Sequence, residues 1–133
     1  MTVFHHAPQA PRSADWPETA PPVLCVGAIL GSQQRVAIPV IVLGEFRYGI
    51  AGSRHQKTYE QWLDGHLRNF DILPIVEATT PAYAKLRTAL KKLGKPIPAN
   101  DAWIAALSIQ HRLPILTRDE HFDSLPEVLR VSW

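Results

Sequence analysis

The stretch Val36–Ile50 reads VAIPVIVLGEFRYGI, and it indicates the fold class of this chain. Its first three residues form an apolar run typical of a short buried strand. Pro39 suits the first turn of a helix, where its missing N–H is not needed, and Gly49 or Gly52 can end that helix. The stretch therefore predicts a buried strand followed directly by a helix, which carries Glu45 among apolar neighbours.

Short apolar strands and helices continue to alternate as far as the C-terminus. We expect strands over residues 36–38, 72–76, 114–117 and 128–131, and helices over residues 39–48, 55–69, 81–93 and 101–111. This order predicts an α/β fold with a mainly parallel sheet. The helix over 101–111 is apolar on almost every side, so we expect it to be buried. Ligands of such sheets gather beyond the carboxyl ends of the strands, close to Asn100-Asp101 and Thr117-Arg118-Asp119.

Three acidic residues stand beside these apolar elements: Glu45, Asp101 and Asp119. Taken alone, each has an ordinary explanation: a solvated helix face, a favourable charge at a helix N-terminus, and a turn or N-cap. Carboxylates that converge repel one another unless a cation is present, and Mg²⁺ or Mn²⁺ prefers oxygen ligands. Such a site can activate water and stabilise charge on a phosphate, so the three acids together indicate phosphodiester hydrolysis.

Three motifs in series resemble those of one family. Val36–Ile50 resembles its second-acid segment, Pro96–Leu107 (PIPANDAWIAAL) resembles its third-acid helix, and Leu116–Phe122 (LTRDEHF) resembles its last metal-site motif. The family is that of the PIN domain ribonucleases, specifically the VapC-type toxins of bacterial toxin–antitoxin pairs. The order and spacing agree from about Gln33 to Trp133.

This resemblance implies a three-layer α/β/α fold and a Mg²⁺-dependent endoribonuclease that acts on structured RNA such as tRNA or rRNA. It also implies a VapB-type antitoxin partner, whose C-terminal tail covers the site, and a homodimer. Carried over by position, Glu45, Asp101 and Asp119 are the metal-binding and catalytic acids. Thr117 supports the site through its hydroxyl, and Asn100 caps the helix that presents Asp101.

Two arginines are candidates for contacts with the RNA backbone. Arg47 and Arg54 lie close in sequence to Glu45, and arginine is a common ligand of phosphate oxygens. We therefore expect both side chains to reach phosphates of a bound RNA.

The composition of the 133 residues excludes several other classes of protein. The chain has 14 Lys+Arg against 12 Asp+Glu, which excludes a strongly basic nucleic-acid coat. Cys25 is the only cysteine, so no internal disulfide is possible. The apolar runs Val23–Leu30 and Val36–Leu43 fall short of the roughly 20 residues of a membrane span. We see no signal peptide and expect a reduced, cytoplasmic setting.

Residues 1–31 differ from the rest of the chain, since they contain five of the 12 prolines. Proline removes amide donors, so we expect an irregular segment over 1–31 and a PIN-like domain over 32–133. The resembled family opens with an apolar strand that ends in an aspartate, commonly as L-D-T-N. Thr2-Val3-Phe4 could be a vestige of that strand, but His5 and His6 follow it.

Two explanations stay open for the missing first aspartate. The first is that residues 1 to about 31 are not native to the domain, through a disrupted reading frame or a wrong start. The second is that the domain is degenerate. Three functional hypotheses follow: an active VapC-type ribonuclease, a catalytically impaired PIN-like module that binds antitoxin or RNA, and a small α/β protein whose three acids are only surface and cap residues.

Overall fold

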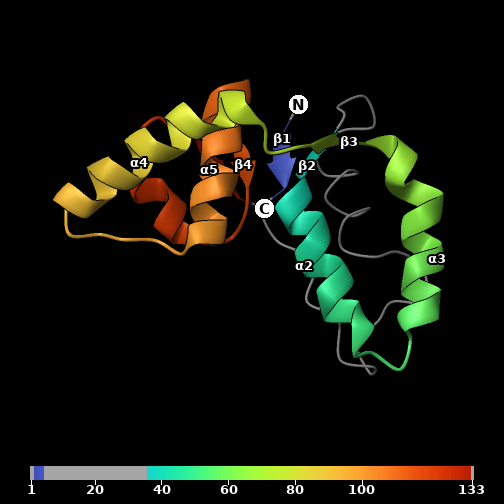
Figure 1. Ribbon diagram of the computed structural model, residues 1–133. Coiled ribbons are helices and arrows are strands. Elements are labelled where there is room, and N and C mark those ends of the chain that lie inside the picture. The colour runs from blue at the N-terminus through green and yellow to red at the C-terminus, as the bar shows by residue number, and fades with distance from the viewer. Residues whose placement is uncertain (1, 5–35, 133) are drawn as a thin grey trace.

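The computed structural model describes residues 2–4 and 36–132. Within them, short strands form one sheet in the order β3-β2-β1-β4-β5, and every neighbouring pair is parallel (Figure 1). The strands are β1 Thr2–Phe4, β2 Val36–Pro39, β3 Phe70–Leu73, β4 Ile115–Leu116 and β5 Arg130–Val131. The predicted parallel α/β sheet is confirmed.

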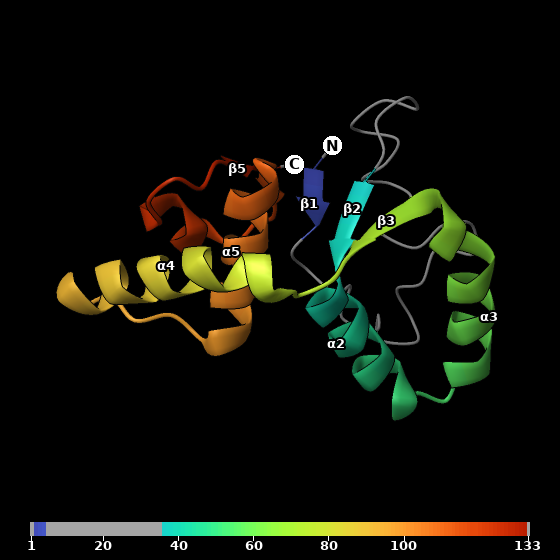
Figure 2. The same cartoon turned by 45° about the horizontal axis from the view of Figure 1, so that its top comes forward.

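The longer helices lie on the two sides of the central strands. Helices α4 and α5 lie on one side, and α2 and α3 lie on the other, as the views in Figures 1 and 2 agree. Their bounds are α2 Val40–Ala51, α3 Gln56–His66, α4 Thr80–Lys92 and α5 Ala99–His111. None of the helices in the described part of the chain has the length and apolarity needed to cross a membrane.

Element boundaries depart from the sequence prediction mainly at prolines. Pro39 is the last residue of β2 and the N-cap of α2, one position before the helix begins. The predicted strand over 72–76 lies instead at Phe70–Leu73 and ends directly before Pro74. β3 is an edge strand, and Pro74 has no amide hydrogen to donate to the sheet. The strand therefore ends at the residue before this proline.

The short strand β1 lies at the centre of the sheet, between β2 and β4. Val3 pairs with Ala37 on one side and with Ile115 on the other. The segment over 1–31, predicted to be irregular, therefore opens with a strand, and residues 5–31 lie outside the described residues. The chain adds β2 and β3 on one side of β1 and then returns to place β4 and β5 on the other. This reversal creates a switch point between β1 and β4, where ligands of open parallel sheets bind.

Two hydrophobic clusters hold the helices in place. The larger joins the sheet to α4 and α5, and its buried members include Ala37, Ile38, Leu86, Leu90, Ile104, Leu107, Ile115, Leu116 and Phe122. The smaller lies between α2 and α3 and consists of Phe46, Ile50, Tyr59 and Leu63. Helix α5 is buried along most of its length, as its all-round apolar sequence predicted.

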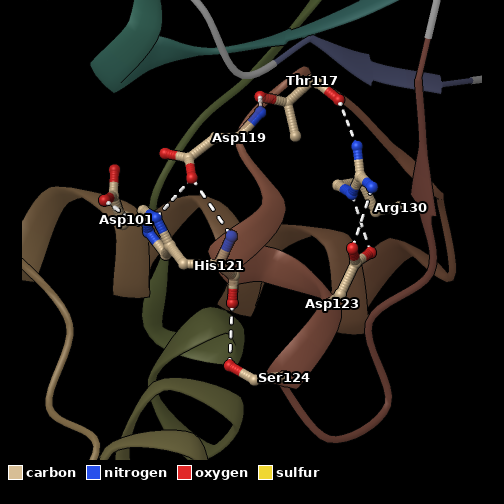
Figure 3. A network of polar contacts seen from close by, with 7 residues as sticks. All are labelled: Asp101, Thr117, Asp119, His121, Asp123, Ser124 and Arg130. Carbon is tan, nitrogen blue, oxygen red and sulfur yellow. Dashed lines mark hydrogen bonds and ion pairs between the residues drawn. The ribbon is translucent and has the colours of Figure 1, made fainter.

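The segment after β4 is fixed to the last strand by Arg130. This segment contains the 3₁₀ helix η3, Glu120–Ser124. The guanidinium of Arg130 donates two hydrogen bonds to Asp123, of 2.7 and 2.8 Å, and a third of 3.2 Å to the backbone oxygen of Thr117 (Figure 3). One side chain therefore joins β5 to the end of β4 and to η3.

Phe122 anchors η3 in the core, and its truncation should destabilise the protein. The side chain is fully buried, so Phe122→Ala should lower the free energy of unfolding by roughly 3–5 kcal/mol, because a large cavity is left behind. Tyr48 is 85% exposed, and Tyr48→Ala should change it by less than about 0.5 kcal/mol. Urea unfolding of both variants measures the difference; equal losses would contradict this picture of the core.

Asp123 should make stability depend on pH in the acid range. Its hydrogen bonds from Arg130 hold the pKa of the Asp123 carboxyl below its ordinary value. A lowered pKa contributes stability above the unfolded-state value of about 3.9, and that contribution is lost as the pH falls through the folded-state pKa. Asp123→Asn should therefore be less stable than the wild type at pH 7, and the difference should shrink below about pH 4. Urea unfolding across this pH range, with Glu77→Gln as an exposed-carboxylate control, tests the trend; a difference that does not vary with pH would oppose it.

Candidate active site

Thr117 directly follows β4 and lies at the carboxyl end of this strand. Its side chain is fully buried, and its Oγ1 accepts a hydrogen bond of 3.0 Å from the backbone N–H of Asp119. Asp119 is in turn the N-cap of η3, since its Oδ1 accepts the backbone N–H of His121 at 3.2 Å. The Asp119 carboxylate is therefore held directly beyond the strand, and the hydroxyl of Thr117 supports the backbone that presents it.

Asp101 approaches the same place from the first turn of α5. Its side chain is 18% exposed, and the helix that carries it is anchored in the core. The sequence predicted Asn100 as the cap of this helix, and that prediction is wrong. Pro98 is the N-cap and Asn100 lies inside the first turn, because the fixed backbone angle of Pro98 already suits an extended residue before a helix.

Asn100 instead connects α5 to Glu45. Its amide donates a hydrogen bond of 2.9 Å to Glu45 Oε1 on α2. Both residues are exposed at their helix surfaces. This bond places the Glu45 carboxylate against Asn100, the residue that precedes Asp101, and links α2 to the start of α5.

His121 joins two of these acids. Its Nε2 lies 3.2 Å from Asp101 Oδ2, and its Nδ1 lies 2.5 Å from Asp119 Oδ1 (Figure 3). The ring also stacks on Phe122, with centroids 4.9 Å apart and planes 19° apart. Neutral imidazole has one N–H and can donate to only one carboxylate, whereas imidazolium can donate to both.

The roles of two residues in this region were not predicted from the sequence. No functional role was assigned to His121, yet its position two residues after an N-cap aspartate was a usable signal, because such a side chain can fold back over the cap. Arg130 was passed over within a short last strand. An arginine in an otherwise apolar strand needs hydrogen-bond acceptors, and here these are the Asp123 carboxylate and the backbone oxygen of Thr117.

The arginines predicted to contact RNA lie on another part of the surface. Arg47 Nη2 is 4.0 Å from Asp64 Oδ1, which ties α2 to α3. Residues two apart on a helix do not face the same way, so Arg47 does not share the direction of Glu45. Arg54 is exposed in the turn after α2. Their contact with RNA stays a prediction.

The donors at this site suit a hard divalent cation only in part. Asp101 and Asp119 each place a carboxylate oxygen against the same imidazole ring. Mg²⁺ is commonly held by one or two carboxylates while it keeps several waters. Within residues 2–4 and 36–132, however, no group of three or more His, Cys, Asp or Glu side chains is placed to hold a metal ion. The residues therefore fit a two-carboxylate site, with Glu45 engaged by Asn100 beside it.

Comparison with known proteins agrees with the motifs. The family model described as PIN domain matches residues 22–128. Ribonuclease VapC4 of Mycobacterium tuberculosis is 34% identical over 98 residues, which are 68% of this chain and 72% of that protein. Ribonuclease VapC5 of the same organism is 31% identical over 104 residues, 73% of this chain and 77% of that protein.

A solved structure supports the same relationship. The crystal structure of VapBC2 from Rickettsia felis, bound to a DNA fragment from their promoter, has a TM-score of 0.74 and 28% identity, and the match covers 83% of each chain. The chain belongs to the PIN domain family, and its predicted likeness to the VapC-type toxins is confirmed.

Proposed function

We propose that this chain is a divalent-cation-dependent endoribonuclease toxin of the VapC type. One observation carries the proposal: Asp101 and Asp119, from separate elements, reach the same imidazole at the carboxyl end of β4. This is the edge of a parallel sheet at which ligands bind. The relatives at 34% and 31% identity, both named ribonucleases, support the same activity.

Asp101 and Asp119 would hold the cation, and Glu45, which is bonded to Asn100, is the third acid in this proposal. Mg²⁺ is the expected ion, and Mn²⁺ is an alternative with similar oxygen preference. When bound, such an ion supplies an activated water and stabilises charge on the phosphate. Thr117 keeps the Asp119 backbone in place, and Asn100 orients Glu45 through its amide.

The substrate in this proposal is structured RNA, such as tRNA or rRNA, and the reaction takes place in the cytoplasm. Exposed arginines on the α2 side of the molecule, Arg47 and Arg54, would contact its phosphates. Because Arg47 also lies near Asp64, RNA would have to compete with a weak surface ion pair there.

A VapB-type antitoxin is the proposed protein partner, and a homodimer is the proposed assembly. The VapBC2 structure, to which this chain is similar over 83% of its length, supports a partner of that kind. In this proposal the C-terminal tail of the antitoxin covers the acidic site and blocks access of RNA.

A second candidate is a catalytically impaired PIN-like module that binds antitoxin or RNA. It is favoured by the end of β1, the central strand next to β4. Phe4 is followed in the sequence by His5, where the resemblance implies an aspartate. A site without that acid has one carboxylate fewer with which to hold a cation.

Nuclease assays separate the two candidates. With Mg²⁺ and tRNA or rRNA, the wild-type chain should cleave, and Glu45→Gln, Asp101→Asn and Asp119→Asn should each lower the rate by about 100-fold or more. The loss is this large because each change removes fixed charge from the reacting site. Glu77→Gln is the matched control, since this carboxylate is exposed and takes no part in the proposed contacts with the cation or RNA. Its rate should equal that of the wild type.

Cleavage by the wild type that survives in Asp101→Asn would indicate a contaminating nuclease or another site, and would contradict the proposal. A wild-type chain that binds RNA or antitoxin without cleaving would establish the second candidate instead.

Thermal unfolding tests the cation itself. A ligand bound only to the folded state at ten times its Kd adds about 1.4 kcal/mol, so Mg²⁺ should raise the Tm of the wild type by several degrees. Asp101→Asn and Asp119→Asn should lose this rise, whereas Glu77→Gln should keep it. Mg²⁺ titrations followed by circular dichroism provide the measurement. If the wild-type Tm does not respond, the three acids are only surface and cap residues.

A further inference from the structure

The imidazole of His121 occupies the space between the two carboxylates assigned above to the cation. Nε2 faces Asp101 Oδ2 at 3.2 Å, and Nδ1 faces Asp119 Oδ1 at 2.5 Å. The two contacts use both nitrogens of the same ring. The ring therefore separates the two carboxylate oxygens by its own width and by both contact distances.

A shared cation requires a different spacing. Mg²⁺ binds oxygen at about 2.0–2.1 Å, so two oxygens that share one ion lie at most about 4 Å apart. Two oxygens on opposite sides of an imidazole ring are much further apart than this. Asp101 and Asp119 therefore cannot share a cation through these oxygens while His121 stays between them.

The ring has room to leave this position. The His121 side chain is 41% exposed, and its stacking partner Phe122 covers one face of the ring. The backbone N–H of His121 bonds to Asp119 independently of the ring. A change of side-chain rotamer can therefore move the ring into solvent without disrupting η3.

We propose that His121 and the divalent cation compete for the carboxylates of Asp101 and Asp119. The inference rests on the proposed function, because it assigns the cation to these two acids. Without the cation, the ring contacts both carboxylates. When the cation binds, the ring is displaced. His121 is then a positioning residue that lowers the affinity of the site for the cation.

Calorimetric titration of the chelator-treated protein with Mg²⁺ alone, at fixed pH, tests this competition. His121→Ala should bind Mg²⁺ about three- to tenfold more tightly than the wild type. The factor is modest because the two contacts given up by the wild type are partly exposed to solvent. His111→Ala, an exposed histidine at the other end of α5, is the matched control and should bind like the wild type.

Magnetic resonance of the ¹⁵N-labelled wild type gives a readout that does not need a variant to fold. Mg²⁺ should shift both ring nitrogens of His121 toward the values of a solvated imidazole, with the same midpoint as the calorimetric Kd. A ring that only packs on Phe122 would show no such shift. His121→Asn, a shorter polar side chain, serves to assign these signals.

Each other result overturns the proposal in an identifiable way. Weaker Mg²⁺ binding by His121→Ala would make His121 a ligand or an organiser of the site. Equal binding, with unshifted ring signals, would remove the competition and leave the cation site intact. If neither wild type nor His121→Ala binds Mg²⁺, the proposed metal-dependent function fails together with the competition.

Discussion

The repulsion between two carboxylates held on either side of one imidazole ring is the constraint on which the rest of the site depends. Asp101 is fixed by a helix buried in the core, and Asp119 is fixed by the buried Thr117 and by its own N-cap bond. Neither backbone can move far without disrupting its element, so a positive or proton-donating partner between the carboxylates stabilises the pair. His121 meets that need in the structure, and a divalent cation meets it in the proposed reaction.

The elements around the site could be predicted from the sequence because their signals are local. The apolar run before Pro39 and the all-round apolar helix gave the sheet and α5, and the three acids followed from their places beside these elements. Hydrogen bonds between residues far apart in the sequence could not be predicted from such local patterns. Asn100 was predicted to cap α5, yet it bonds to Glu45, 55 positions away in the chain. His121 reaches Asp101 across 20 positions.

The site also depends on residues that touch no acid of the proposed cation site. Arg130 holds Asp123 and the backbone oxygen of Thr117, and so it fixes the end of β4 from the far side of the loop. Phe122 anchors the same loop in the core and supports the ring of His121. Substitutions of Arg130 or Phe122 should alter the geometry of Asp119, although neither residue is one of the acids.

The central place of β1 has a consequence for how the protein is made. Val3 pairs with Ile115, so the middle of the sheet closes only when two segments far apart in the sequence meet. Asp101, Asp119 and β4 all follow β3 in the sequence, so they leave the ribosome after it. A nascent chain that ends after β3 contains only Glu45 of the three acids and lacks β4 and β5. The acidic site therefore cannot assemble from the first three strands alone, and it forms only once the chain has been synthesised beyond Asp119.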